Sequence, residues 1–239
     1  MDFSQRSYQK ELLDDDDIPF EDIRRNMYEL DLINTYLGGH NITIQGIKSI
    51  IGDIAVFKAT NVPLRICEIG CGGGDNLIAI EKWCNKHGIN VELIGIDIKK
   101  ECIEYARSRI SKENYKWIIS DFRDVYFQNQ RPSIIFSSLF CHHFTEVEVI
   151  EMLWWLKNNS AMGFFINDLH RHSFAYYSIK GITKFFSKSY LVKNDAPLSV
   201  LRGFSRSEWQ AILEEAKVTN YKLLWKWAFR WLIVRRNGS

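Results

Sequence analysis

The sequence lacks several features that mark membrane, secreted and nucleic-acid-binding proteins. No apolar run approaches the roughly 20 residues that a membrane-spanning helix needs. The first residues, MDFSQRSYQKELLDDDD, do not follow the basic-then-apolar plan of a signal peptide. Lys and Arg total 31 against 29 Asp and Glu, so net charge gives no support for nucleic-acid binding. We therefore expect a cytoplasmic protein with no membrane span and no nucleic-acid partner.

Cysteine is also sparse, and its spacing excludes common metal and disulfide frameworks. The five cysteines are odd in number and contain no C-x-x-C pair, and several fall inside apolar stretches. This pattern predicts reduced, packed thiols rather than disulfides. The five are Cys67, Cys71, Cys84, Cys102 and Cys141.

What the sequence does contain is a strand and helix alternation. Apolar residues make up 46% of the 239 residues, enough for one well-buried core. A helix is predicted over 20–37, ended by Gly38 and Gly39, and a second over 41–59. Strands at 64–70, 91–97, 115–121, 133–140 and 163–168 then alternate with helices at 75–87, 99–110 and 145–157. Near-continuous apolar strands of this kind indicate an α/β fold, with a mostly parallel sheet covered by helices on both faces.

The pattern changes after the fifth strand. Residues 170–200 form an aromatic-rich insertion, and Ser205 and Glu208 have capping-box spacing at the start of a helix over 205–216. Two strand-like runs within 220–236 predict an antiparallel hairpin on the sheet edge, which completes seven strands. We expect residues 1–60 to form a helical lid and 61–239 to form the main domain.

Charge is distributed unevenly along the chain. Residues 1–60 carry 6 basic and 11 acidic side chains, whereas residues 171–239 carry 13 basic and 4 acidic. Solvated helix faces are the favoured explanation, and electrostatic docking of the acidic N-terminus near the basic C-terminal third is the alternative.

A glycine-rich turn follows the first predicted strand, in LRICEIGCGGGDNLIAI. Such a turn presents backbone amides at a helix N-terminus. The dinucleotide fingerprint G-x-G-x-x-G is not matched, because Asp75 stands where its third glycine belongs. The pattern is instead E-x-G-x-G-x-G, formed by Glu68, Gly70, Gly72 and Gly74. Two further acids, Asp97 and Asp121, end the second and third strands.

These three acids and the glycine turn resemble the cofactor site of class I S-adenosyl-L-methionine (AdoMet) methyltransferases. The resemblance implies a Rossmann-like methyltransferase fold in which Asp97 accepts hydrogen bonds from the ribose hydroxyls. It implies that Asp121 binds the adenine amino group and that Phe122 borders the ring. It also assigns Cys71, Ile98 and Leu139 to the cofactor site, beside the residues of the E-x-G-x-G-x-G turn.

The likeness covers nearly the whole chain. The stretches RSYQKELLDDDD, DLINTYLGG and NDLHRHSFAYYSIKGIT are similar to a subgroup of bacterial small-molecule methyltransferases. That subgroup is associated with polyketide or aryl-pigment pathways and is distantly similar to ubiquinone and menaquinone methyltransferases. The four prolines include no pair, so the Asn/Asp-Pro-Pro-aromatic motif of amino-methylating enzymes is missing after the fourth strand. Cys141 follows Phe140 rather than the Pro or Thr usual before a cytosine-methylating cysteine.

Histidines after the fourth and fifth strands are the candidates for acid–base chemistry, because ligands of such sheets lie at the carboxyl ends of the strands. A neutral imidazole can take the proton of a phenol. We expect His170 to be the base, with His143 as second choice. His142, Arg171, Tyr176 and Tyr177 are expected to contact the substrate.

A metal site is the competing use of this histidine group. Asp168, His170 and His172 have i, i+2, i+4 spacing and could be joined by His143. The resembling family generally works without metal, and we expect none.

The sequence therefore predicts O-methylation of a small apolar phenolic or polyketide-like acceptor. Alternatives are C-methylation of a quinone-type ring, a NAD-dependent reductase, and a non-catalytic cofactor-binding protein. The oligomeric state stays open.

Overall fold

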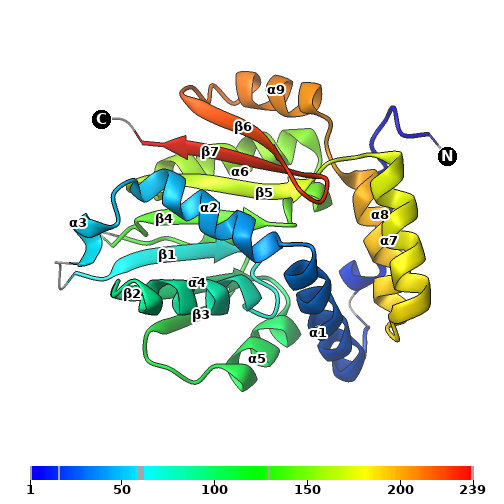
Figure 1. Cartoon of the computed structure of the whole chain (residues 1–239), viewed down its shortest axis with the longest axis horizontal. Helices are drawn as coiled ribbons and strands as arrows, with labels where there is room; N and C mark the ends of the chain where they lie inside the picture. Colours follow the sequence, from blue (N-terminus) through cyan, green and yellow to red (C-terminus); the bar gives the residue numbers. More distant parts are fainter. Residues whose placement is uncertain (1, 16, 59–61, 129, 238–239) are drawn as a thin grey trace.

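A seven-stranded sheet forms the centre of the molecule, in the order β3-β2-β1-β4-β5-β7-β6 (Figure 1). This computed structural model describes residues 2–15, 17–58, 62–128 and 130–237. β1 to β5 are parallel, and β7 runs antiparallel to both β5 and β6. The predicted α/β class and the C-terminal antiparallel hairpin are confirmed. The strands are β1 (Leu64–Ile69), β2 (Val91–Asp97), β3 (Tyr115–Ile119), β4 (Ile134–Ser138), β5 (Gly163–Leu169), β6 (Tyr221–Lys226) and β7 (Arg230–Arg236).

Helices cover both faces of the sheet because its central strands are apolar on both sides. On one face, α2 and α4 bury Ile47, Ile50, Leu77 and Ile80 against the sheet. On the other face, α6 and α9 bury a second cluster around Trp209. The helices over the sheet are α2 (Gly39–Ile51), α4 (Asp75–Lys86), α5 (Lys100–Arg109), α6 (Glu146–Asn159) and α9 (Arg206–Glu215).

Local sequence signals explain most helix boundaries. The predicted capping box of Ser205 and Glu208 forms at the start of α9, and Thr145 and Glu148 form another at α6. The single helix predicted over 41–59 was wrong, because α2 ends at Gly52, whose φ of 68° breaks the helix. A short α3 (Ala55–Lys58) follows, and residue 59 lies outside the described part of the chain.

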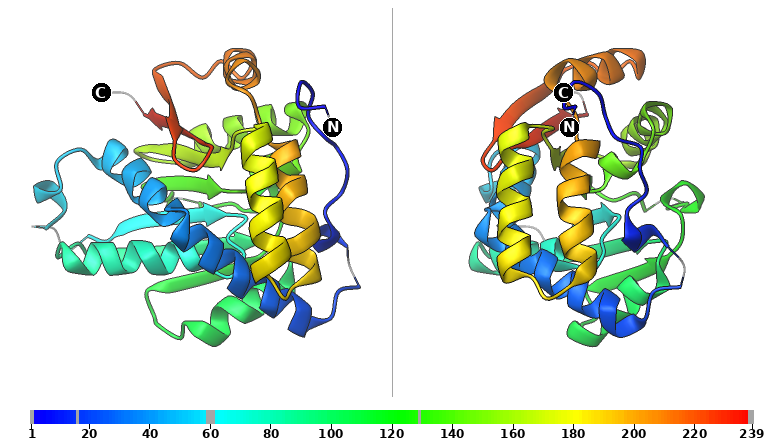
Figure 2. Two further views of the ribbon diagram at one scale, coloured as in Figure 1. Left: turned by 45° about the vertical axis from the view of Figure 1, so that its right-hand side comes forward. Right: turned by 90° about the vertical axis from the view of Figure 1, so that its right-hand side faces the viewer.

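The aromatic-rich insertion is a helical hairpin rather than an irregular segment. Its helices, α7 (Ser173–Phe186) and α8 (Tyr190–Arg202), stand side by side across the carboxyl ends of the parallel strands (Figure 2). α1 (Phe20–Tyr36) lies at the same end of the sheet, where it contacts α5 and α8. The sequence therefore places three helices where ligands of parallel sheets bind.

The first residues of the chain, 2–15, form an extended segment with one short 3-10 turn, η1 (Leu12–Asp14), which we call the N-terminal strap. Backbone amides of Leu12 and Leu13 donate to the carboxylate of Asp195 on α8, at 2.8 and 3.0 Å. Arg202 donates to the carbonyl of Gln9 at 2.6 Å and lies 3.9 Å from Glu11. Docking of the acidic N-terminus on the basic C-terminal third, the less favoured explanation of the charge asymmetry, is what the structure shows for this segment.

The structure bears on two expectations from the sequence, those for the cysteines and for membrane-spanning helices. All five cysteines are buried and unpaired. Within the described ranges, no helix is both long and apolar enough to cross a membrane.

Candidate active site

One large cavity lies at the carboxyl ends of the strands, beneath α1, α7, α8 and the N-terminal strap. Its volume is about 900 Å³, near the upper end of the roughly 300–1,000 Å³ typical of small-molecule sites. One part is lined by the glycine turn and by the residues that follow β2 and β3. The other part is lined by the residues after β4, by α8 and by the turn between β6 and β7.

The glycine turn runs from the end of β1 into α4 as predicted. Gly70 and Gly74 have φ values of 64° and 76°, which a residue with a side chain rarely adopts. Glu68 is buried beside the turn, and its Oε1 accepts a 2.8 Å hydrogen bond from Asn76. Its Oε2 has no partner, although it is fully buried at the cavity wall. An unsatisfied buried carboxylate oxygen here fits the ammonium group or a bound water of an amino-acid moiety.

Asp97 and Asp121 line the cavity at the ends of neighbouring strands. The Asp97 carboxylate accepts from the backbone amides of Gly72, at 2.8 Å, and Lys99, at 2.9 Å, which fixes its orientation. Burial raises the pKa of Asp97, against the effect of these two hydrogen bonds. Asp121 pairs with Arg123 at 2.6 Å, and this hydrogen bond lowers the pKa of Asp121. Each carboxylate keeps lone pairs for further donors.

The remaining predicted cofactor residues divide into two groups. Cys71, Ile98, Phe122 and Leu139 line the cavity together with Gly70 and Gly72. Gly74 does not line it; it stands at the N-cap of α4, with its α-carbon against the Trp117 ring. Its contribution is therefore to the turn that holds the other residues.

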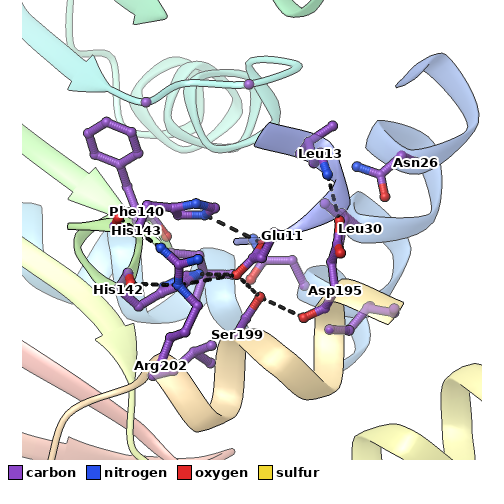
Figure 3. Close-up of a pocket in the computed structure, with 18 of the residues that line it drawn as sticks. Glu11, Leu13, Asn26, Leu30, Phe140, His142, His143, Asp195, Ser199 and Arg202 are labelled. Atoms are coloured by element: carbon purple, nitrogen blue, oxygen red, sulfur yellow. Dashed lines mark hydrogen bonds and ion pairs between the residues drawn. The ribbon is translucent and has the colours of Figure 1, made fainter. Parts of the chain in front are cut away.

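His142 and His143 follow β4 in a short 3-10 turn, η3 (Cys141–His143), and both line the cavity. Nδ1 of His142 lies 2.7 Å from the carboxylate of Asp168, and Nδ1 of His143 lies 3.2 Å from that of Asp14. Each Nε2 faces Glu11 of the strap, at 3.6 and 3.7 Å (Figure 3). His142 is buried, whereas 21% of the His143 side chain is exposed, so His143 is the more accessible of the two.

The acids around His143 raise its pKa. Burial lowers its pKa, but the hydrogen bond to Asp14 and the charge of Glu11 outweigh burial and raise the pKa above the ordinary value. Arg202 opposes them: it donates to the backbone carbonyls of both histidines and holds η3 against α8. The Glu11 carboxylate is itself oriented by Ser199, whose hydroxyl donates to it at 2.7 Å.

Four residues predicted at the site lie elsewhere. His170 is not on the cavity wall; its Nδ1 accepts a hydrogen bond from the Trp225 indole at 3.2 Å, and its ring lies against Trp231. His170 also forms an isolated parallel bridge with Phe204, directly after β5.

Arg171 has a structural set of partners: it pairs with Glu208 at 2.7 Å and donates to the backbone carbonyls of Phe3 and Ser4 in the strap. Tyr176 is buried against Phe3, and Tyr177 is largely exposed; neither lines the cavity. We therefore drop these four residues from the proposed site.

A metal could be held by a different set from the one considered in the sequence. One ligand atom each from Glu11, His142 and His143 lie within 4.8 Å of one another. His170 and His172 take no part in this group. The expectation that the protein works without metal stays a prediction, which a chelator control can test.

Several cavity residues have no signal in the sequence. Glu11, Asp14 and Arg202 come together from distant segments, and only the charge asymmetry between the two ends pointed to them. Asn26 on α1 lines the cavity with its amide buried and unpartnered, and Arg230 does so from the start of β7. Neither residue lies in a sequence motif. Their positions in a helix pattern and a strand pattern gave no sign that they line a site.

Known proteins share this fold. Residues 66–159 match the family model described as a methyltransferase domain. The plantazolicin methyltransferase BpumL, solved with SAH, is similar at 19% identity and a TM-score of 0.59, covering 84% of this chain and 74% of its own. Human N-acetylserotonin methyltransferase, solved with SAM, has 15% identity and a TM-score of 0.59, covering 92% and 57%. Magnesium protoporphyrin IX methyltransferase from Synechocystis PCC 6803 has 12% identity and a TM-score of 0.51, covering 94% and 90%.

The fold is that of these solved methyltransferases. Together with the match of residues 66–159 to a methyltransferase domain, this fold is the basis for the AdoMet-dependent activity proposed below.

Proposed function

We propose that the protein transfers a methyl group to an oxygen of a small, largely apolar acceptor. The observation that carries the proposal is the cavity, which joins the cofactor residues to His143 in one continuous space. Its remaining walls are mostly apolar and suit an aromatic or polyketide-like molecule. Apolar wall residues include Met27, Leu30, Leu37, Leu169, Ile179 and Ile182.

His143 is the proposed general base. With Nδ1–H donating to Asp14, Nε2 is the basic atom, and it faces the cavity beside Glu11. A phenol has a pKa near 10 and is mostly protonated at neutral pH, so a neutral imidazole would take its proton during transfer. Such a base typically contributes about 10²- to 10⁴-fold to the rate. AdoMet supplies the electrophilic methyl group when bound.

Of the predicted lid over 1–60, the strap and α1 are proposed to act as the lid, whereas α2 packs against the face of the sheet. The strap, α1, α7 and α8 all contribute residues to the cavity wall. These segments lie at the carboxyl ends of the parallel strands (Figure 2). Closure excludes water and holds the acceptor in line with the methyl group, and such positioning can contribute about 7–11 kcal/mol. The 60/61 boundary of this lid lies outside the described residues.

The test is a turnover assay with methyl-labelled AdoMet and a panel of phenols, catechols and hydroxyquinones, with and without a chelator. We expect methylated oxygen in the product by NMR. His143→Ala should reduce kcat by about 10²- to 10⁴-fold without changing SAH affinity. The control is His87→Ala, at the far end of α4, whose Nδ1 contacts only the Trp83 carbonyl. Carbon methylation, or equal losses in both variants, would contradict the proposal.

A further inference from the structure

Arg230 is a buried cation on the cavity wall with few of its donors used. It begins β7 and is 2% exposed. Nη1 donates to Oδ1 of Asn34 at 2.8 Å, whereas Nε is buried without a partner. In the described part of the chain, no carboxylate lies within the 4.0 Å of an ion pair with Arg230. Its charge is therefore compensated only at longer range, chiefly by Asp168.

The other buried arginines differ from Arg230 in this respect. Arg171 forms an ion pair with Glu208 at 2.7 Å. Arg202 lies 3.9 Å from Glu11 and donates to three backbone carbonyls. Arg6 has no acid beside it, but it donates to the carbonyls of Arg202, His142 and Phe144. Arg171 and Arg202 are satisfied by the protein itself. Nη1 of Arg6 is also buried without a partner, but Arg6, unlike Arg230, does not line the cavity. All three arginines hold the strap and α8 in place.

A guanidinium with free donors in a cavity is suited to a ligand anion. Burial lowers the pKa of Arg230 to about 10, so the group is still protonated at neutral pH. An uncompensated buried charge is unfavourable, and a carboxylate that accepts two parallel N–H bonds from the guanidinium would remove that penalty. Lys would not reproduce this geometry, because its ammonium is a point charge.

Arg230 is held by its hydrogen bond to Asn34, and Asn34 lies close to the hydrogen-bonded group of Glu68, Asn76 and His40 beside the cofactor turn. Asn76 links Glu68 to His40, at 2.8 and 3.0 Å, and Asn34 contacts His40 at 3.4 Å and Arg230 at 2.8 Å. The guanidinium is thus held at the wall between α1 and the β6–β7 turn.

The sheet order separates Arg230 from the nucleoside residues. β7 is the third strand from β1, on the side opposite β2 and β3. The neighbouring wall residues of this part of the cavity, Leu37, Leu169 and Phe229, come from α1, β5 and the β6–β7 turn region. The charge therefore lies on the acceptor side, in otherwise apolar surroundings.

We infer that Arg230 binds a carboxylate of a small molecule in this cavity, which makes an apolar acid the favoured acceptor class. The identification of this small molecule as the methyl acceptor rests on the proposed function. The methionine carboxylate of the cofactor is the other possible source of the same carboxylate. Binding measurements can separate the two sources without any turnover.

The experiment is calorimetric titration of the full-length protein and of its Arg230→Met and Arg230→Lys variants. SAH is compared with 5′-methylthioadenosine, which lacks the amino-acid carboxylate. The SAH-saturated protein is then titrated with 4-hydroxybenzoate and with 4-hydroxybenzamide. Arg236→Gln is the matched control, since Arg236 lies on the same strand but is exposed and off the cavity wall. Circular dichroism and binding of 5′-methylthioadenosine report whether each variant folds.

We expect the SAH complex to bind the benzoate more tightly than the benzamide. Arg230→Met should weaken benzoate binding by about tenfold or more and so abolish that preference. Arg230→Lys should restore part of the preference, and Arg236→Gln should leave it intact. If Arg230→Met loses affinity for SAH but not for 5′-methylthioadenosine, the inference is supported and the carboxylate that Arg230 binds is that of the cofactor. Folded variants with unchanged SAH affinity and no change in carboxylate preference would overturn it, as would the absence of benzoate binding alongside unchanged SAH affinity. Failure to methylate any phenol would count only against the proposed function.

Discussion

The two parts of the cavity are built in different ways. On the cofactor side, Glu68, the glycine turn, Asp97 and Asp121 all lie within 54 residues of sequence, each at the end of a strand or in the turn that follows it. On the acceptor side, Glu11, His143, Arg202 and Arg230 come from the strap, η3, α8 and β7. The first side depends on local geometry repeated along a parallel sheet, and the second depends on long-range docking.

This difference predicts how sensitive each part of the cavity is to substitution. Residues on the cofactor side are fixed by backbone hydrogen bonds, such as those from Gly72 and Lys99 to Asp97. Residues on the acceptor side are fixed by side chains that reach between segments, such as Arg202 to η3 and Ser199 to Glu11. The acceptor side should therefore be more sensitive to the loss of a single remote side chain.

The largest effect is expected on the cofactor side, from Asp97→Ala. The change removes two charge-assisted hydrogen bonds from the turn and the proposed acceptor for ribose. Each such bond contributes about 1.5–3 kcal/mol, so SAH affinity should fall by at least roughly 100-fold. Calorimetry checks this, with Asp124→Ala as control because that exposed carboxylate is not on the cavity wall. Near-normal affinity in Asp97→Ala would contradict the assignment of this side.

The next effect tests the docking of the strap. Arg202→Ala removes a buried guanidinium from between Glu11, Asp14 and three backbone carbonyls. We expect the free energy of unfolding to fall by about 3 kcal/mol, because two acids lose their cationic partner. Denaturant titration measures this, and limited proteolysis at Lys10 shows whether the strap is released. Arg24→Ala is the control, since its pair with Glu21 is exposed; equal stability of both variants would show that docking does not depend on Arg202.

A smaller and more specific effect is expected from Asp14→Asn. The raised pKa of His143 means that its neutral form is lost as the pH falls through a value above the ordinary one, and kcat/KM should fall with it. Removing the Asp14 charge lowers that pKa, so the acidic limb of the pH profile should move to lower pH. Asp15→Asn, an exposed strap residue, should leave the limb in place. An unmoved limb in Asp14→Asn would exclude His143 as the titrating group.

The smallest effect is expected from His170→Ala. Its ring contacts Trp225 and Trp231 outside the cavity, so SAH affinity and turnover should remain at the level of the unaltered protein. A steady-state assay with the acceptor found in the phenol panel is sufficient. A rate loss as large as that of His143→Ala would return His170 to the role of base and remove the distinction drawn between the two sides.

Sequence patterns predicted the cofactor side because a strand end, a turn and a carboxylate are coupled locally. Gly70 and Asp97 would stand at the same edge in any parallel sheet of this connectivity. The acceptor side was predicted less well for a physical reason. After β5, His170 pairs with Phe204 and its ring contacts Trp225 and Trp231 outside the cavity, and no local pattern encodes these contacts.

The sequence by itself determined the sheet, most of the helices that cover it, the C-terminal hairpin, the glycine turn and the three acids, because periodicity and turn chemistry act between near neighbours. Only the tertiary structure decided which histidines face the cavity, that the strap closes over them, and that Arg230 is left with free donors in an apolar wall. Those outcomes depend on contacts between residues as far apart as Asn34 and Arg230, separated by 196 positions, which only the folded chain brings together.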